Sequence, residues 1–196
     1  MTVDETVRFV VTALEDLTVD YAIGGSFASG TWGEPRTTND LDLVLNLRRA
    51  DLQAFTNVFE PHFAIGSDAL SEALESSDPY RGSYMTSYDS AFQVDIFLLN
   101  RSPYDLEEFA RRTRRTLLPG LDAWIFSAED TILRKLAWYE SGNRRSDKQW
   151  NDVQQILHVR QGLLDENYLA HWAPELGVAE LLQQAVAEQI ESEPEK

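Results

Sequence analysis

The chain has 196 residues, of which 43% are hydrophobic and 11% aromatic, enough for one compact domain or for a domain with a helical extension. No apolar run reaches the roughly 18 residues that cross a bilayer, and the first residues are acidic where a secretory leader is basic. The absence of cysteine excludes disulfides and thiolate metal sites. We therefore expect a cytoplasmic protein without a membrane partner. Its net charge of -16 disfavours broad nucleic-acid binding.

The first part of the chain alternates between helix and strand patterns. Apolar residues three and four positions apart predict a helix over 4–16. A short strand then runs into a glycine turn, and a short helix over 26–32 starts at Ser26, which suits an N-cap position. The following segments are predicted as a strand over 40–47, a helix over 49–61, a helix or loop over 67–78, and two strands within 82–100 around a polar turn.

The second part of the chain becomes helical. Residues 102–114 predict a helix, and 115–127 predict a strand pair around a Pro-Gly turn. Ser127 and Asp130 form a capping box that opens the first of three helices, expected near 127–140, 146–160 and 165–190. The order indicates an α+β fold with a mixed β-sheet core and flanking helices over 1–126. A C-terminal helical extension over 127–196 follows.

Two aspartates, Asp40 and Asp42, interrupt an apolar strand. Because side chains alternate along a strand, both point to one face while the neighbouring leucines point to the other. Two adjacent carboxylates repel each other, and one of them takes up a proton unless a cation compensates. Mg²⁺ or Mn²⁺ prefers such oxygen ligands. The alternative is a solvated strand edge, but Asp95 interrupts a second apolar strand in the same way, which favours a metal site.

A glycine pair lies upstream of these aspartates. Gly24 and Gly25 allow the backbone to approach a ligand closely, and Ser26 opens a helix whose unpaired N–H groups and dipole attract anions. Gly-Gly-Ser alone is a weak signal, since most glycine pairs are only turns. Together with the three carboxylates, it predicts a phosphate-binding turn.

The glycine turn, the paired aspartates and the later strand aspartate together resemble the DNA polymerase beta-like nucleotidyltransferase superfamily. The residues that carry the resemblance are Gly24, Gly25, Ser26, Arg36, Asp40, Asp42 and Asp95. The segment R-T-T-N-D-L-D is similar to small bacterial members, including abortive-infection toxins and lincosamide or aminoglycoside nucleotidyltransferases. The helices that follow residue 127 resemble those of other bacterial members, so the likeness covers roughly residues 20–172.

The resemblance implies transfer of a nucleoside monophosphate from an NTP, such as ATP, to an acceptor hydroxyl. It implies that Asp40 and Asp42 hold the metal that binds the triphosphate. Asp95 would complete a second metal site near the attacking hydroxyl, as a ligand or as the general base. The Gly24–Ser26 turn would bind the outer phosphates.

Two cations complete the predicted nucleotide site. Lys135 lies in an apolar helix stretch, where an unpaired lysine is rare. The resemblance implies a phosphate ligand, and the alternative is a lysine whose head reaches water or pairs with an acid such as Asp152. Arg36 contacts the triphosphate, orients Asp40, or is an exposed loop arginine. Asp130 and Asp152 have polar neighbours in their helices and are expected to be structural.

The acceptor stays open between a small molecule, a protein hydroxyl and an RNA end. The acidic charge suits a cationic small molecule such as an aminoglycoside. An RNA end would need local basic contacts, for which Arg101 and the arginines within 111–115 are the candidates. The alternative function is a noncatalytic nucleotide- or partner-binding module on the same fold. The strand pair over 113–125 is a candidate homodimer contact.

Overall fold

The computed structural model describes residues 1–76, 78 and 82–192. The chain divides into two compact units, one formed by Met1–Gly24 with Thr37–Ile125 and the other by Gly25–Arg36 with Phe126–Lys196. The chain passes from the first unit to the second for the last time between Ile125 and Phe126, beside the expected boundary at 126. Residues 25–36, by contrast, belong with the helices of the second unit rather than with the sheet.

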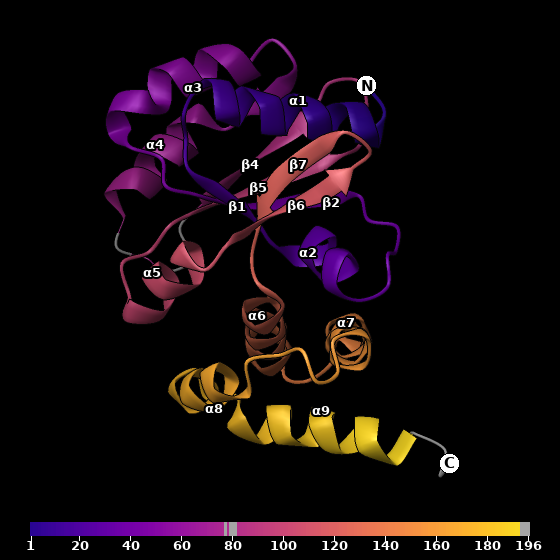
Figure 1. Ribbon diagram of the computed structural model, residues 1–196. Coiled ribbons are helices and arrows are strands. Elements are labelled where there is room, and N and C mark those ends of the chain that lie inside the picture. Colours follow the sequence, from indigo (N-terminus) through magenta and orange to yellow (C-terminus); the bar gives the residue numbers. More distant parts are fainter. Residues whose placement is uncertain (77, 79–81, 193–196) are drawn as a thin grey trace. The chain divides into compact units, whose positions relative to one another are not determined.

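A seven-stranded mixed sheet runs through the described residues of the first unit, in the order β3-β4-β5-β2-β1-β7-β6 (Figure 1). Its strands are β1 (Tyr21–Ile23), β2 (Asp40–Leu45), β3 (Phe63–Ile65), β4 (Gly82–Ser87), β5 (Gln93–Leu98), β6 (Thr113–Leu118) and β7 (Leu121–Ile125). The β1–β7 and β2–β5 pairs are parallel, and the other pairs are antiparallel. The expected α+β fold with a mixed sheet is confirmed.

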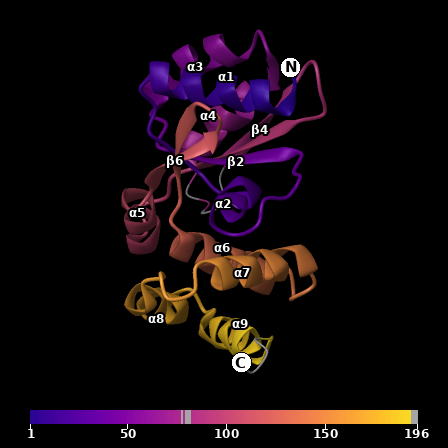
Figure 2. The same ribbon diagram turned by 45° about the vertical axis from the view of Figure 1, so that its right-hand side comes forward.

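The helices of the first unit are α1 (Val3–Asp16), α3 (Leu52–Phe59), α4 (Ser67–Glu75) and α5 (Pro103–Ala110), with a 3₁₀ turn at Arg49–Asp51 before α3. Helix α1 begins with a capping box, in which the Glu5 N–H donates to Thr2 Oγ1 and the Thr2 N–H donates to Glu5 Oε2. Figures 1 and 2 show α1 and α3 side by side on one face of the sheet, where the Phe9 and Phe59 rings pack at 5.8 Å.

The second unit contains α2 (Gly25–Trp32), α6 (Ala128–Ser141), α7 (Asp147–Val159), α8 (Glu166–Glu175) and α9 (Ala179–Ser192). Helices α6 and α7 pack side by side (Figure 1), and Leu136 and Ile156 are fully buried. The predicted cap is confirmed, since Ser127 accepts a hydrogen bond from the Asp130 N–H at 3.1 Å. The Trp32 indole donates to the Phe126 carbonyl at 2.8 Å and fastens α2 to the chain that leads into α6.

Three expectations about individual elements are corrected. The single helix over 165–190 is wrong: α8 ends at a Schellman motif, in which Gly177 adopts φ 70° and the Val178 N–H bonds the Ala173 carbonyl. Strand β3 was not expected, because three residues are too few to show alternation. Helix α2 begins at Gly25, so Ser26 lies in its first turn and is not the N-cap. None of the helices in the described ranges combines the length and apolarity that a bilayer crossing requires.

Candidate functional site

The structure brings the three predicted carboxylates to one face of two neighbouring strands. Strands β2 and β5 run parallel with Asp42 opposite Asp95 and Asp40 opposite Gln93. In both strands every second residue is buried, and the aspartates occupy the half-exposed positions between them. The periodicity that predicted the site therefore also explains it, because the apolar residues face the core and leave the carboxylates on the opposite face.

The aspartate side chains have local partners. Thr38 Oγ1 donates a hydrogen bond to Asp40, and Gln93 Nε2 donates one to Asp95. The Gly24 N–H donates to the Asp42 carbonyl at 2.9 Å, so the glycine turn leaves the sheet beside this strand. Within residues 1–76, 78 and 82–192, no three acidic or histidine side chains point together closely enough to hold a metal ion. The strand register supports a metal site, but the present side-chain directions do not form one.

The carboxylate face continues onto β4, which pairs with β5. Across β2, β5 and β4, one row contains Asp42, Asp95 and Tyr84, and the next contains Val44, Phe97 and Gly82. The Tyr84 side chain is 60% exposed, although it lies within a strand. An aromatic ring therefore flanks Asp95 on the side away from Asp42.

Asp152 on α7 accepts four hydrogen bonds from three side chains of the second unit. Arg36 Nε donates to its Oδ1 at 2.9 Å and Arg36 Nη2 donates to its Oδ2 at 3.0 Å, which is a two-pronged ion pair. Lys135 Nζ donates to Oδ2 at 2.8 Å, and Ser29 Oγ donates to the same oxygen at 3.1 Å. The Asp152 and Lys135 side chains are only 8% and 6% exposed. Two cations therefore share one buried carboxylate.

These contacts show how the two predicted cations are held within the second unit. Lys135 pairs with Asp152, as the alternative for this lysine expected. Arg36 is not an exposed loop arginine, because it is half-buried and its Nη2 also donates to Ser26 Oγ at 2.6 Å. Burial raises the pKa of the Asp152 carboxyl, but the hydrogen bonds and charges of Arg36 and Lys135 outweigh burial, so this pKa lies below its usual range.

The phosphate-turn residues divide at the boundary between the units. Gly24 follows β1, and Gly25 opens α2 with φ 54°, a left-handed conformation that glycine adopts without strain. Ser26 is buried in the first turn of α2, where it accepts the hydrogen bond from Arg36. The first N–H groups of a helix have no partner within the helix, which is the feature that binds anions.

Sequence reasoning gave Asp152 a structural role, as an acid that could pair with Lys135, and gave Ser29 no role. The signal was present for Asp152, because it lies on the buried face of α7 with Val153, Ile156 and Leu157. An acidic residue on an apolar helix face needs a partner. Asp130 gives the same signal: it is fully buried and accepts hydrogen bonds from the Ser127 and Tyr168 hydroxyls, both at 2.6 Å.

The arginines of the basic cluster have acidic and aromatic partners. Arg112 pairs with Asp20 at 3.2 Å, and Arg114 pairs with Glu15 at 3.3 Å. The Arg112 guanidinium also lies 4.2 Å from the centroid of the Phe109 ring. These two arginines are therefore held within the first unit by local contacts.

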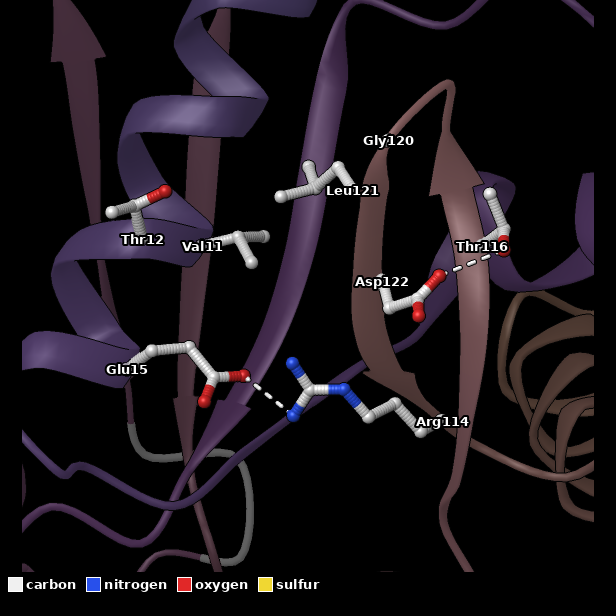
Figure 3. A pocket seen from close by; sticks show the side chains of 8 residues that line it. All are labelled: Val11, Thr12, Glu15, Arg114, Thr116, Gly120, Leu121 and Asp122. Carbon is white, nitrogen blue, oxygen red and sulfur yellow. Dashed lines mark hydrogen bonds and ion pairs between the residues drawn. The ribbon is translucent and has the colours of Figure 1, made fainter.

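A cavity of about 460 Å³ lies between α1 and the β6–β7 hairpin (Figure 3). Its polar side chains pair with one another: Glu15 with Arg114, and Thr116 with Asp122 at 2.7 Å. The predicted site residues do not line it. We therefore place the candidate active site on the carboxylate face and not in this cavity.

No protein-family model matches the sequence, and no curated protein matches it. Solved structures do match. An antigenic nucleotidyltransferase-like protein from Paracoccidioides brasiliensis is 20% identical with a TM-score of 0.54, over 93% of this chain and 91% of that one.

Two structures with antibiotic-derived ligands are also similar. ANT(2'')-Ia, in complex with adenylyl-2''-tobramycin, is 14% identical with a TM-score of 0.56, over 97% of this chain and 99% of that one. The lincosamide antibiotic adenylyltransferase LnuA, bound to lincomycin, is 11% identical with a TM-score of 0.54, over 79% and 96%. At these identities the likeness establishes the fold. The chain has the nucleotidyltransferase fold, as the motif around Asp40 and Asp42 predicted.

Proposed function

We propose that the protein is a metal-dependent nucleotidyltransferase, which moves a nucleoside monophosphate from an NTP to an acceptor hydroxyl. The observation that carries this proposal is the register of Asp42 with Asp95 on parallel strands, with Asp40 on the same face. Such a row is costly without a counter-ion, because like charges directly opposite each other destabilise a sheet.

The donor chemistry of this face fits Mg²⁺ or Mn²⁺, which prefer carboxylate oxygens. Asp40, Asp42 and Asp95 are the residues that would hold it. A bound ion would take the place of the hydrogen bonds that Thr38 and Gln93 donate to Asp40 and Asp95. A bound ion would supply neutralisation of the triphosphate charge at the reacting phosphorus.

The transfer itself is a displacement at the α-phosphorus of the NTP. The acceptor oxygen forms a bond to this phosphorus, and the bond from the α-phosphorus to the bridging oxygen breaks. Pyrophosphate leaves with the electron pair. We assign Asp95 as the general base that takes the hydroxyl proton and passes it to solvent, because a carboxylate next to the acceptor favours deprotonation.

The cationic network of the second unit is proposed as the triphosphate contact. Arg36 and Lys135 place two positive charges beside the carboxylate of Asp152, and cations of both kinds bind phosphate oxygens. The free N–H groups at the start of α2 would add to this attraction, since anions bind at helix N-termini.

The acceptor that we favour is a cationic small molecule with a free hydroxyl. The net charge of -16 attracts cations and repels polyphosphates. Two arginines of the cluster that an RNA end would need, Arg112 and Arg114, are paired with Asp20 and Glu15. The similar structures contain a tobramycin adduct and lincomycin, so these two compounds serve as probes.

The test is pyrophosphate release and adduct formation. Purified protein is incubated with ATP, Mg²⁺ and tobramycin or lincomycin, and products are detected by mass spectrometry. We expect release that stops on chelation and falls by at least about 100-fold in Asp42→Asn, since a metal contributes several kcal/mol to the transition state. Asp122→Asn, on β7 of the same sheet, is the matched control.

A noncatalytic nucleotide-binding module is the second candidate. It predicts Mg²⁺-dependent ATP binding without pyrophosphate release for any acceptor, including protein and RNA ends. Failure to bind ATP in the presence of Mg²⁺ or Mn²⁺ would overturn both candidates.

A further inference from the structure

Asp152 joins Arg36 and Lys135, two residues from separate parts of the chain that the proposed function assigns to the nucleotide. We infer that Asp152 is a positioning residue of the nucleotide site, which holds both cations charged and correctly directed for the triphosphate. This inference rests on the proposed function. Neither the motif nor its resemblance assigned Asp152 a role.

The geometry at Asp152 restricts direction as well as charge. Arg36 uses Nε and Nη2 on the two carboxylate oxygens, at 2.9 and 3.0 Å, so the plane of the guanidinium is fixed by two parallel hydrogen bonds. Lys135 Nζ approaches Oδ2 at 2.8 Å. A single hydrogen bond would leave each head group free to swing, but the shared carboxylate holds the two together.

Burial makes an anionic partner important for the charge of Lys135, and Asp152 is such a partner. The lysine side chain is 6% exposed, and a buried ammonium without a partner loses its proton or turns toward water. Arg36 stays protonated in any setting, so its charge would repel a neighbouring Lys135 if the carboxylate were neutral. Asp152 therefore maintains two like charges in one buried place.

The network extends from Asp152 to the first turn of α2. Arg36 Nη2 bonds Ser26 Oγ at 2.6 Å, and Ser29, one turn later on the same helix, bonds Asp152 Oδ2 at 3.1 Å. Asp152 thus fixes α2 both directly and through Arg36. Loss of its charge would release the arginine and loosen the start of the helix that is predicted to meet the phosphates.

A purely structural clamp between helices is the competing explanation, and the chain offers a matched comparison. Asp130 is also a fully buried aspartate in the second unit, where it accepts hydrogen bonds from the Ser127 and Tyr168 hydroxyls. Both Asp130→Asn and Asp152→Asn remove a buried carboxylate from a helix. Asp152 is bound to both cations assigned to the nucleotide, whereas the two hydrogen bonds to Asp130 come from neutral hydroxyls.

The experiment measures thermal stability, ATP kinetics and binding of a non-hydrolysable ATP analogue with Mg²⁺. We expect both variants to melt at lower temperature than wild type. Asp152→Asn weakens analogue binding and raises the KM for ATP by about tenfold or more, the size expected for a weakened charge-assisted contact. Its kcat at saturating ATP stays within a few-fold of wild type. Asp130→Asn leaves the KM for ATP unchanged.

Asp152→Glu is the second variant and keeps the negative charge on a longer side chain. It allows the inference to be tested even if Asp152→Asn fails to fold. We expect it to recover part of the lost ATP affinity. The inference is overturned if folded Asp152→Asn or Asp152→Glu binds the analogue as wild type does, or if Asp130→Asn weakens binding equally. A wild-type protein that binds no analogue also overturns it.

The outcomes separate the inference from the proposed function. Wild-type binding of the analogue, weakened in Asp152→Asn but without pyrophosphate release, would support the role of Asp152 and reject the transfer reaction. Transfer activity with an unchanged KM for ATP in Asp152→Asn would do the reverse.

Discussion

Asp42 and Asp95 lie directly opposite each other on the parallel strands β2 and β5. Side chains at opposed positions of a sheet are close neighbours, so the two carboxylates repel each other wherever both are charged. A fold that keeps this pair on the half-exposed face loses stability there. The metal ion that we propose for this face would relieve this repulsion.

The first prediction concerns this repulsion. Asp95→Asn removes one of the two opposed charges and should raise the free energy of unfolding without metal by roughly 0.2–1 kcal/mol. Mg²⁺ should stabilise the wild type, because a ligand bound only by the folded state shifts the unfolding equilibrium, and should stabilise the variant less, because only Asp40 and Asp42 remain as carboxylate ligands. Urea denaturation with and without excess Mg²⁺ measures both effects. The metal assignment is contradicted if Mg²⁺ stabilises Asp95→Asn as much as wild type, or if Mg²⁺ stabilises neither protein. Asp122→Asn serves as the control.

The second prediction concerns pH and Asp152. Its pKa lies below the usual value of about 4, because the contacts with Arg36 and Lys135 outweigh its burial. A group with a lowered pKa in the folded state adds stability that is fully present above the unfolded pKa and is lost as the pH falls. Wild type should therefore exceed Asp152→Asn in stability at neutral pH, and the gap should narrow below about pH 5.

The measurement is denaturation of both proteins across this pH range. At neutral pH the free energy of unfolding should differ between wild type and Asp152→Asn by about 3 kcal/mol. This is the lower end of the loss expected when one partner of a buried ion pair is removed. A constant gap from neutral to acid pH would mean that Asp152 stabilises the fold through packing rather than charge.

The sequence was sufficient for the carboxylate face because the information there is local. Alternation in β2 and β5 identifies which residues are buried, and the aspartates between them, Asp40, Asp42 and Asp95, are visible without knowledge of strand pairing. The register that places Asp42 against Asp95 is a tertiary property. It could be expected from the resemblance to known nucleotidyltransferases but not calculated from the pattern.

The network around Asp152 could not be predicted to the same depth. Its members lie at positions 26, 29, 36, 135 and 152, so no periodicity connects them. An arginine in a loop carries no signal of its partner. The pairing of Lys135 with Asp152 was predictable only as one alternative. The two residues lie on different helices, and the sequence does not show which faces of those helices meet.

The third prediction concerns Gly82 at the start of β4. A Cβ atom at this position would lie 2.1 Å from the Ile96 carbonyl oxygen, which is a backbone atom of the neighbouring strand and cannot rotate away. Gly82→Ala should therefore shift β4 against β5 and cost about 1–3 kcal/mol. Gly30→Ala, inside α2, meets no atom closer than 3.4 Å and should be neutral or stabilising by up to about 1 kcal/mol.

Thermal or urea denaturation of the two alanine variants tests the contrast. Because β4 also presents Tyr84 beside Asp95, we expect Gly82→Ala to lower transfer activity with the small-molecule acceptor as well. Unchanged stability of Gly82→Ala would show that the strand accommodates a methyl group.

The fourth prediction concerns the acceptor. Tyr84 pairs with Asp95 across β4 and β5 and is 60% exposed, so its ring lies beside the proposed general base. We expect the ring to stack against a cationic acceptor, an interaction worth about 0.5–2 kcal/mol. Tyr84→Ala should accordingly raise the KM for tobramycin or lincomycin by about 2–30-fold. The KM for ATP should not change, because the ring is assigned to the acceptor alone.

Tyr88→Ala is the matched control for the acceptor. Tyr88 is 63% exposed but lies in the turn after β4, outside the row that contains Asp42 and Asp95. Its removal should leave both KM values unchanged. Equal effects of the two substitutions would assign the loss to general surface hydrophobicity. An increase in the KM for ATP in Tyr84→Ala would indicate that the nucleotide base, and not the acceptor, lies next to Asp95.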